Sequence, residues 1–325
     1  MTALPIRARR LAASRGPRIA AALAGALLLA SLTGAAASQP AQASQLAPIY
    51  PVQAAFASPG PYATTTGTVT DATGTMIYDV FRPSDYSALG FASPIVTWGN
   101  GTGASPAKVS DFLSHLASHG FTVIASTLPN TGSGNEIDDA AHYLVTQNGV
   151  ATSVFHGHLN TGEVAAVGTS QGATGAVRAA TNDPALIKAV MTFSLPNSVW
   201  SGPNPDCPTA ADCTANPAAL TQPVFFISTY GFWDSIIASP ATEKAYFLST
   251  SVHAALGIIL TSDGKLADHT SIQNAAVGGN PGGFFGYATA WLEYQLRGNA
   301  TAAGAFTGPH PELLSNINWP GSAVK

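Results

Sequence analysis

One short stretch constrains the fold of this chain more than any other. Residues 164–176 read VAAVGTSQGATGA, an apolar run followed by Gly168-x-Ser170-x-Gly172 and then by small, helix-compatible residues. This order predicts a strand, a sharp turn and a helix, with a serine hydroxyl lifted clear of the sheet. Glycine suits both ends of the turn, where a Cβ would clash with neighbouring backbone. The chain has 32 glycines, so a simple Gly/Ser loop is the alternative, but the flanking patterns favour the strand–turn–helix.

The first 43 residues form a segment of different character. Five arginines lie within the first 18 residues, 19–37 is apolar, and Ala41-Gln42-Ala43 offers a small-x-small cleavage site before Ser44. A membrane anchor is the alternative, because the apolar run approaches the roughly 20 residues that span a bilayer. Its Ala/Gly content and the cleavage site favour a signal peptide, 1–43, that is removed. We therefore expect a secreted protein with a single domain, 44–325, and no stable membrane insertion after cleavage.

Composition and charge limit the remaining function classes. Of the 325 residues 46% are hydrophobic and 9% charged, which is typical of one large domain with a substantial core. All 17 acidic residues follow position 43, whereas five of the 13 basic residues precede it, so 44–325 carries a net charge of −9 with histidines neutral. Such a surface repels nucleic acid, and we expect no nucleic-acid partner.

The chain contains two cysteines, Cys207 and Cys213. In an exported protein this spacing predicts a disulfide that closes a small loop. A pair of metal ligands is the alternative, but no His or Cys partners lie at zinc-like spacing. We predict a disulfide and no metal site.

Strand and helix patterns alternate along most of the chain. Residues 44–60 resemble an extended lead, and 62–69 with 75–81 predict an antiparallel hairpin. The buried-type strands expected after it are 94–98, 121–125, 164–167, 187–193, 224–227 and 254–260. The expected helices start at Ser105-Pro106 and cover 136–147, the segment from the serine turn to Ala180, and 284–296. This alternation predicts an α/β fold whose mostly parallel sheet has helices on both faces.

A serine nucleophile needs a base, and the base needs a carboxylate that orients it. In proteins built around this turn the acid and then the histidine follow the serine, each beyond a strand's C-terminal end. Asp234 follows strand 224–227, whereas Glu243 lies further on in an expected helix. Asp268 is adjacent to the candidate base, His269, and cannot easily reach around to its ring. Asp234 is therefore the preferred acid.

His269 is the preferred base. It follows strand 254–260 and precedes the last helix, where the base belongs. The other histidines precede Ser170, precede that strand, or lie in the Pro-flanked tail. Order and placement together select Ser170, Asp234 and His269 as a candidate catalytic set.

An oxyanion hole would complete the chemistry. One donor is the backbone N–H of the residue after the nucleophile, here Gln171, and the other comes from the loop after an earlier strand. The Gly-rich loop 99–103 fits the second role, with Thr102 as the donor. A phosphate-binding turn is the alternative, but the Lys-Ser/Thr of a Walker motif and the Gly-x-Gly-x-x-Gly spacing are both absent.

From about 60 to 298 the chain resembles the secreted bacterial cutinase and polyethylene-terephthalate-hydrolase family, including its lipase relatives. LASHGF at 116–121 is similar to the family's helix-to-strand corner, and counting back from it puts Thr102 at the family's aromatic oxyanion-hole position. NDPAL at 182–186 and LPNSVW at 195–200 resemble the segment that ends in the family's subsite tryptophan, here Trp200. Asp234-Ser235-Ile236 is similar to the acid loop with its subsite isoleucine. The resemblance implies an α/β-hydrolase fold, carboxylic-ester hydrolysis and no cofactor.

The chain also departs from this family. Thr169 and Gln171 replace the residues that usually flank the serine, and Thr102 replaces an aromatic ring. Phe232 and Trp233, in what resembles a lengthened acid loop, either restore an aromatic wall or pack in the core. The Cys207–Cys213 insertion has no counterpart in the family pattern.

These features together predict a secreted serine esterase of lipid-like or polyester substrates that works through an acyl-enzyme. Trp200, Phe232, Trp233 and Ile236 are the candidate substrate contacts, and a small-molecule, lipid or polymer ester is the expected partner. We expect a monomer. An esterase of acetyl or feruloyl groups is the first alternative, and a non-catalytic binding protein on the same fold is the second.

Overall fold

The computed structural model describes residues 49–200, 209, 213–274 and 283–325. Ala47–Lys325 forms one compact unit. The expected signal peptide, 1–43, lies outside the described residues, as does Cys207.

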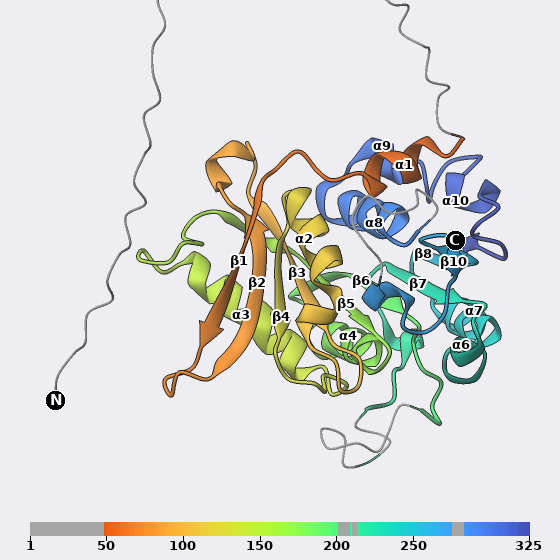
Figure 1. Ribbon diagram of the computed structural model, residues 1–325, viewed down its shortest axis with the longest axis horizontal. Helices are drawn as coiled ribbons and strands as arrows, with labels where there is room; N and C mark the ends of the chain where they lie inside the picture. The colour runs from red at the N-terminus through yellow and green to blue at the C-terminus, as the bar shows by residue number, and fades with distance from the viewer. Residues whose placement is uncertain (1–48, 201–208, 210–212, 275–282) are drawn as a thin grey trace, which may run out of the picture. The chain divides into compact units, whose positions relative to one another are not determined.

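A mixed sheet of nine strands organises the described part of the chain (Figure 1). Its strand order is β1-β2-β4-β3-β5-β6-β7-β8-β11, and a separate two-stranded ribbon joins β9 to β10. The strands run over Thr64–Thr70 (β1), Met76–Pro83 (β2), Ser93–Gly99 (β3), Thr122–Ser126 (β4), Leu159–Thr169 (β5), Ile187–Phe193 (β6), Val224–Thr229 (β7), Ala254–Ile259 (β8), Thr261–Ser262 (β9), Lys265–Leu266 (β10) and Ala323–Val324 (β11).

The sheet is parallel in its centre and antiparallel at both edges. Strands β4, β3, β5, β6, β7 and β8 pair in parallel. The hairpin β1–β2 joins β4 in antiparallel register at one edge, and β11 joins β8 in the same way at the other. The predicted hairpin and the mostly parallel sheet are therefore confirmed. The sequence did not predict the short strand β11.

Helices connect the strands and cover both faces of the sheet (Figure 1). The α-helices run over Pro51–Ala57 (α1), Ser110–Ser118 (α2), Asn135–Asn148 (α3), Gln171–Asn182 (α4), Phe232–Ile237 (α6), Pro240–Ser249 (α7), Phe285–Arg297 (α8), Ala300–Ala303 (α9) and Glu312–Ser315 (α10). Single 3₁₀ turns run over Tyr86–Ala88 (η1), Pro106–Val109 (η2), Pro217–Ala219 (η3) and Ser271–Asn274 (η4).

Two hydrophobic cores result from the alternation of side chains along the strands. On β3, Val96 and Trp98 pack toward the core that includes α2 and α8, whereas Ile95 packs toward the core that includes α3 and α4. All three side chains are fully buried. Because the sheet is covered on both faces, its central strands are continuous apolar runs.

The expected extended lead is wrong over one segment, since Pro51–Ala57 forms α1. Pro51 occupies the first turn, where a proline needs no hydrogen-bond partner. Glu312 accepts hydrogen bonds from the amides of Val52 at 2.7 Å and Gln53 at 2.8 Å. A carboxylate about 260 residues away thus caps this helix, and no local pattern indicates it.

None of the helices in the described ranges is both long and apolar enough to cross a bilayer.

Candidate active site

The turn between β5 and α4 presents Ser170 in a strained conformation. Its backbone has φ 53° and ψ −124°, which is unusual for a residue with a side chain. A Cβ on Gly168 would lie 2.1 Å from the carbonyl oxygen of Gly172, and one on Gly172 would lie 2.2 Å from that of Gly99. The turn therefore requires glycine at both positions, as the sequence predicts.

Three side chains from distant parts of the chain meet at this turn. Ser170 follows β5, Asp234 lies in the first turn of α6 after β7, and His269 follows the β9–β10 ribbon that β8 leads into. His269 Nε2 lies 2.8 Å from Ser170 Oγ, and His269 Nδ1 lies 2.7 Å from Asp234 Oδ1. A carboxylate only accepts hydrogen bonds, so Nδ1 carries the proton and Nε2 is free to accept one from Ser170.

The second oxygen of Asp234 is held just as firmly. Oδ2 accepts hydrogen bonds from the Thr229 hydroxyl at 2.7 Å, the Thr229 amide at 3.1 Å and the Ser194 hydroxyl at 2.9 Å. Ser194 has a φ of 54°, a strained conformation that aims its side chain at the carboxylate. The carboxylate is completely buried, and these donors fix its orientation toward His269. The sequence did not single out Thr229 or Ser194.

Asp268 has a structural role that the sequence did not indicate. Its Oδ1 accepts hydrogen bonds from the amides of Trp233 at 2.9 Å, Asp234 at 3.2 Å and His269 at 2.8 Å. A Cβ on Gly231 would lie 2.4 Å from the same oxygen, so the two loops approach closely. Asp268 thus joins the segment that carries the candidate acid to the segment that carries the candidate base.

The remaining nearby carboxyl, Glu243, is buried beneath the site. It accepts a hydrogen bond from the amide of Leu195 at 2.7 Å. Burial raises the pKa of Glu243 well above its ordinary value, and the charge of Asp234 raises it further. The sequence placed Glu243 in a helix, and it lies in α7.

The loop after β3 lies against Ser170. Residues 101–104 form a turn in which the amide of Ala104 donates to the carbonyl of Gly101 at 3.0 Å, and Gly103 has a φ of 71°. A Cβ on Gly101 would lie 3.4 Å from Ser170 Cβ. Thr102 is therefore exposed at a turn beside the serine. Gln171 is the first residue of α4, where backbone N–H groups have no partner within the helix.

A buried network supports this loop from below. The side-chain Nδ2 of Asn100 donates to the backbone carbonyls of Ser126 at 2.7 Å and Leu128 at 2.9 Å. The Thr131 hydroxyl donates to the Asn100 carbonyl at 3.0 Å, and the Thr131 amide donates to Gln171 Oε1 at 3.0 Å. The side chain of Gln171 thereby connects the serine turn to the loop. No periodic pattern in the sequence indicates this network.

A cleft of about 440 Å³ opens over the serine. The described residues that line it are Gly101, Thr102, Gly103, Ala104, Lys108, Ser170, Trp200, Ile237, His269, Thr270 and Gln273. Lys108 is an exposed cation in this lining, and no sequence pattern singles it out. Thr270 and Gln273 also line the cleft. They follow His269 closely in the chain, and this proximity could have predicted them as lining residues.

The four predicted substrate contacts differ in position. Trp200 lines the cleft with 52% of its surface exposed. Phe232 and Trp233 are also exposed and pack edge to face with ring centroids 5.4 Å apart, so they do not belong to the core. Ile236 is exposed beside them, whereas its neighbour Ile237 is among the described lining residues.

The predicted disulfide involves Cys207, which lies outside the described residues. Cys213 is fully buried.

A mostly parallel sheet covered on both faces, with a strained serine between a central strand and a helix, defines the α/β-hydrolase fold. A family model described as "PETase: PET hydrolase-like" matches residues 38–224, more than half of the chain. The chain therefore belongs to the PET hydrolase-like family, whose members are serine hydrolases that act on esters. The matched range includes Ser170 and the loop at 99–103 but ends before Asp234 and His269. None of the curated proteins compared with the chain matches it significantly.

Proposed function

We propose that this chain is a secreted carboxylic-ester hydrolase in which Ser170, His269 and Asp234 form the catalytic triad. The observation that supports this most strongly is the continuous line of two hydrogen bonds, at 2.8 and 2.7 Å, from the serine hydroxyl through the imidazole to a buried carboxylate. In this arrangement the base can accept the serine proton, and the carboxylate keeps the imidazole in the required tautomer.

Acylation begins when Ser170 Oγ attacks the ester carbonyl carbon while His269 Nε2 takes the hydroxyl proton. Asp234 stabilises the imidazolium ion that results. The carbonyl oxygen becomes an oxyanion, for which the backbone N–H groups of Thr102 and Gln171 are the proposed donors. The tetrahedral intermediate then collapses, the C–O bond to the alcohol breaks, and His269 protonates the leaving oxygen.

Deacylation repeats these steps with water as the nucleophile. His269 takes a proton from a water molecule, whose oxygen attacks the acyl carbon attached to Ser170. Collapse of the second tetrahedral intermediate releases the carboxylic acid and returns the proton to Ser170. The exposure of the cleft to solvent supports this step, because water can reach the acyl carbon.

We propose lipid-like or polyester substrates. The open cleft of about 440 Å³ has room for part of a long acyl chain or an aromatic diester, and Trp200 supplies an apolar ring at its margin. One observation favours small acetyl esters over aromatic acyl esters, feruloyl esters included. Thr102 provides no ring on the oxyanion side of the cleft, so an aromatic acyl group would have a thinner clamp there.

Export from the cell is part of the proposal. It is supported by the arginine-rich start of the chain, the apolar run at 19–37 and the small-x-small site before Ser44. N-terminal sequencing of the protein from culture medium would test it, and a mature chain that begins at Ser44 is the expected result.

A fluorophosphonate probe tests the nucleophile directly. We expect it to label Ser170 in the intact chain and to leave Ser170→Ala unlabelled. The same variant should lose turnover on the order of 10⁴-fold or more while keeping its melting temperature. A wild-type protein that resists the probe would support a non-catalytic binding protein, and an active Ser170→Ala would refute the proposed nucleophile. A panel from p-nitrophenyl acetate to long acyl esters and polyester film then distinguishes the substrate classes.

A further inference from the structure

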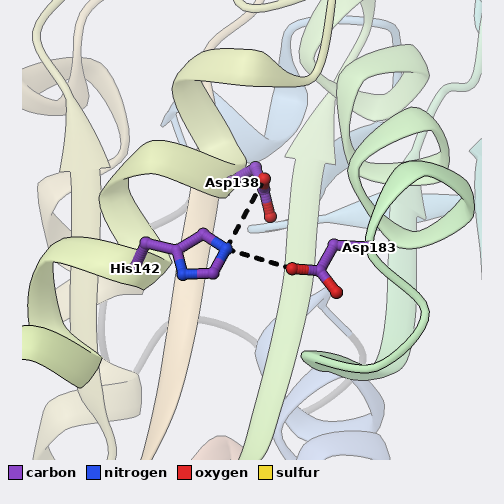
Figure 2. Close-up of side chains that lie close together, drawn as sticks. All are labelled: Asp138, His142 and Asp183. Carbon is purple, nitrogen blue, oxygen red and sulfur yellow. Dashed lines mark hydrogen bonds and ion pairs between the residues drawn. The ribbon is translucent and has the colours of Figure 1, made fainter.

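Away from the cleft, a histidine and two aspartates converge on the outer side of α3 and α4. Asp138 and His142 lie one turn apart on α3, and Asp183 directly follows the last residue of α4. Figure 2 shows the imidazole of His142 directed between the two carboxylates. His142 Nε2 lies 3.0 Å from Asp183 Oδ2 and 3.8 Å from Asp138 Oδ2. The three ligand atoms all lie within 4.8 Å of one another.

Hydrogen bonding among these groups leaves Asp138 poorly satisfied. A single N–H on Nε2 serves Asp183 at 3.0 Å, and the 3.8 Å distance to Asp138 is too long for a hydrogen bond. The other oxygen of Asp138, Oδ1, is buried and has no hydrogen-bond partner among the described residues. The ion pairs that the described residues make with these two carboxylates are both with His142. Burying part of a carboxylate without a full set of partners costs free energy, and a cation bound through Oδ2 would offset part of that cost by neutralising the charge of Asp138.

The distances from His142 Nε2 to the two carboxylate oxygens are compatible with a small transition-metal site. Ligands about 2.05 Å from a tetrahedral zinc ion lie about 3.4 Å from each other. The two measured separations from Nε2, 3.0 and 3.8 Å, lie on either side of this value. Small side-chain movements would therefore bring all three ligands into place. His142 is about half exposed, with 53% of its side chain accessible, so water can supply the fourth ligand.

We propose that Asp138, His142 and Asp183 form a binding site for Zn²⁺. An imidazole nitrogen with two carboxylate oxygens is a donor set that suits zinc, whereas calcium prefers oxygen ligands only. The two carboxylates balance the charge of a divalent ion. In the metal-bound form His142 is neutral, with the proton on Nδ1 and the Nε2 lone pair on the metal. His142 and Asp183 are 41 positions apart in the sequence, which explains why sequence spacing gives no zinc motif.

Zinc at this site would stabilise the fold without taking part in ester hydrolysis. It would join the middle of α3 to the end of α4. Ser170 precedes the first residue of α4 and Asp183 follows the last, so about 18 Å of helix separates the site from the nucleophile. Because zinc would bind the folded chain, it should raise the melting temperature.

The test uses the chain purified without a polyhistidine tag and treated with a chelator. Calorimetric titration with Zn²⁺ should show one ion bound per chain, and micromolar Zn²⁺ should raise the melting temperature by several degrees. Asp138→Asn, His142→Ala and Asp183→Asn should each weaken zinc binding at least tenfold. The Asp183→Asn side chain can still accept the hydrogen bond from the Leu186 amide, so this variant is expected to fold.

Matched controls separate this site from the other histidines and carboxylates. Asp139→Asn changes an exposed neighbour on α3, and His156→Ala removes an exposed histidine elsewhere. Both should bind zinc like the wild type, and Ca²⁺ should raise the melting temperature far less than Zn²⁺ does. A wild-type chain that binds no zinc, unchanged binding by His142→Ala, or stabilisation by Ca²⁺ alone would each overturn the proposal. Ester hydrolysis should be unchanged by the chelator.

Discussion

The floor of the cleft, formed by Asp234 and His269, and its rim, where Trp200 and Phe232 lie, differ in burial and in hydrogen bonding. At the floor, Asp234 is completely buried and both of its oxygens are hydrogen bonded, and only 11% of the His269 side chain is accessible. At the rim, Trp200 and Phe232 have 52% and 67% of their surfaces exposed. The floor joins segments that are far apart in the chain, whereas the rim residues project from connections at its edge.

This difference separates the reaction from the choice of substrate. Positions fixed by several hydrogen bonds keep their geometry whatever ester is bound, so changes there should affect all esters alike. Exposed rings contact only the body of the substrate, so changes there should affect some esters and spare others. The two regions therefore make opposite predictions for a substrate panel.

The largest effect after loss of the nucleophile is expected at Asp234. In Asp234→Asn, the amide would donate toward Nδ1 of His269 and favour the tautomer with the proton on Nε2. That tautomer cannot accept the proton of Ser170, so kcat/KM should fall by roughly 10⁴-fold for every ester, from acetate to polymer. Steady-state kinetics on the panel measures this.

Asp263→Asn is the matched control. Asp263 has a φ of 51° in the turn between β9 and β10, a conformation that asparagine also tolerates. The kcat/KM of Asp263→Asn should remain near that of the wild type. A severe loss in Asp263→Asn with a mild one in Asp234→Asn would show that the acid has been assigned to the wrong residue.

Asp268 is expected to affect the rate only by positioning Asp234 and His269. Asp268→Ala removes the acceptor shared by the amides of Trp233, Asp234 and His269. A displacement of about 1 Å between the acid and the base can cost on the order of 100-fold in kcat. Asp268→Asn keeps an acceptor oxygen and should retain most of the rate. Equal losses in the two variants would indicate that the charge of Asp268, and not its position, matters.

The sequence predicts the parts of the fold that depend on local patterns. The strand at 187–193 is confirmed with the same bounds, because a run of apolar residues between turns is typical of a buried parallel strand. Helix α1 was missed because its stability depends on Glu312, which caps it from the other end of the chain. Helix α6 was expected to be a loop, and its first turn is capped by Asp268.

The same distinction applies to the candidate site. Ser170 stands out in the sequence because its turn has strict steric requirements on both sides. Order along the chain and placement after strands selected Asp234 and His269, and the structure brings both to Ser170. The supporting residues Thr229, Asn100 and Thr131 act through single contacts across the fold, which have no periodicity and therefore no sequence signal.

A change of Glu243, which is buried beneath the site, is expected to affect the stability of the fold and not the rate of hydrolysis. Because burial raises its pKa in the folded chain, the unfolded chain releases the proton at lower pH than the folded chain does. The stability contributed by Glu243 is therefore present below pH 4.5 and is lost as the pH rises toward the folded pKa, by up to about 1.4 kcal/mol per pH unit. Glu243→Gln should melt at a higher temperature than the wild type at pH 8.

The pH dependence is the control for this prediction. Near pH 4 the carboxyl and the amide are both neutral, so the melting temperatures of Glu243→Gln and the wild type should converge. The hydrogen bond to the Leu195 amide is available to both side chains. A variant less stable than the wild type at pH 8 would mean that the carboxylate is charged and stabilised in the folded chain.

The smallest effect is expected at the rim. Trp200→Ala removes a half-exposed ring from the cleft wall. Stacking of this kind contributes about 0.5–1.5 kcal/mol, so kcat/KM for aromatic and long acyl esters should fall roughly 2- to 10-fold. The rate on acetate should hardly change, because acetate is too short to reach the ring. Phe232→Ala is the matched control, since Phe232 is more exposed and is not among the described lining residues.

Phe232→Ala should leave the rate of hydrolysis of every soluble ester unchanged. It should slow only the hydrolysis of polyester film, whose flat surface can contact the rim. The melting temperature decides between a substrate contact and a structural tryptophan. Loss of a core tryptophan would cost about 3–5 kcal/mol, whereas a side chain with half of its surface exposed should cost far less. If Trp200→Ala lowered the melting temperature sharply and slowed the hydrolysis of acetate esters as much as that of long esters, Trp200 would be a structural residue and not a substrate contact. Substrate choice would then depend on Phe232, Trp233 and Ile236, which lie on the exposed surface beside the cleft.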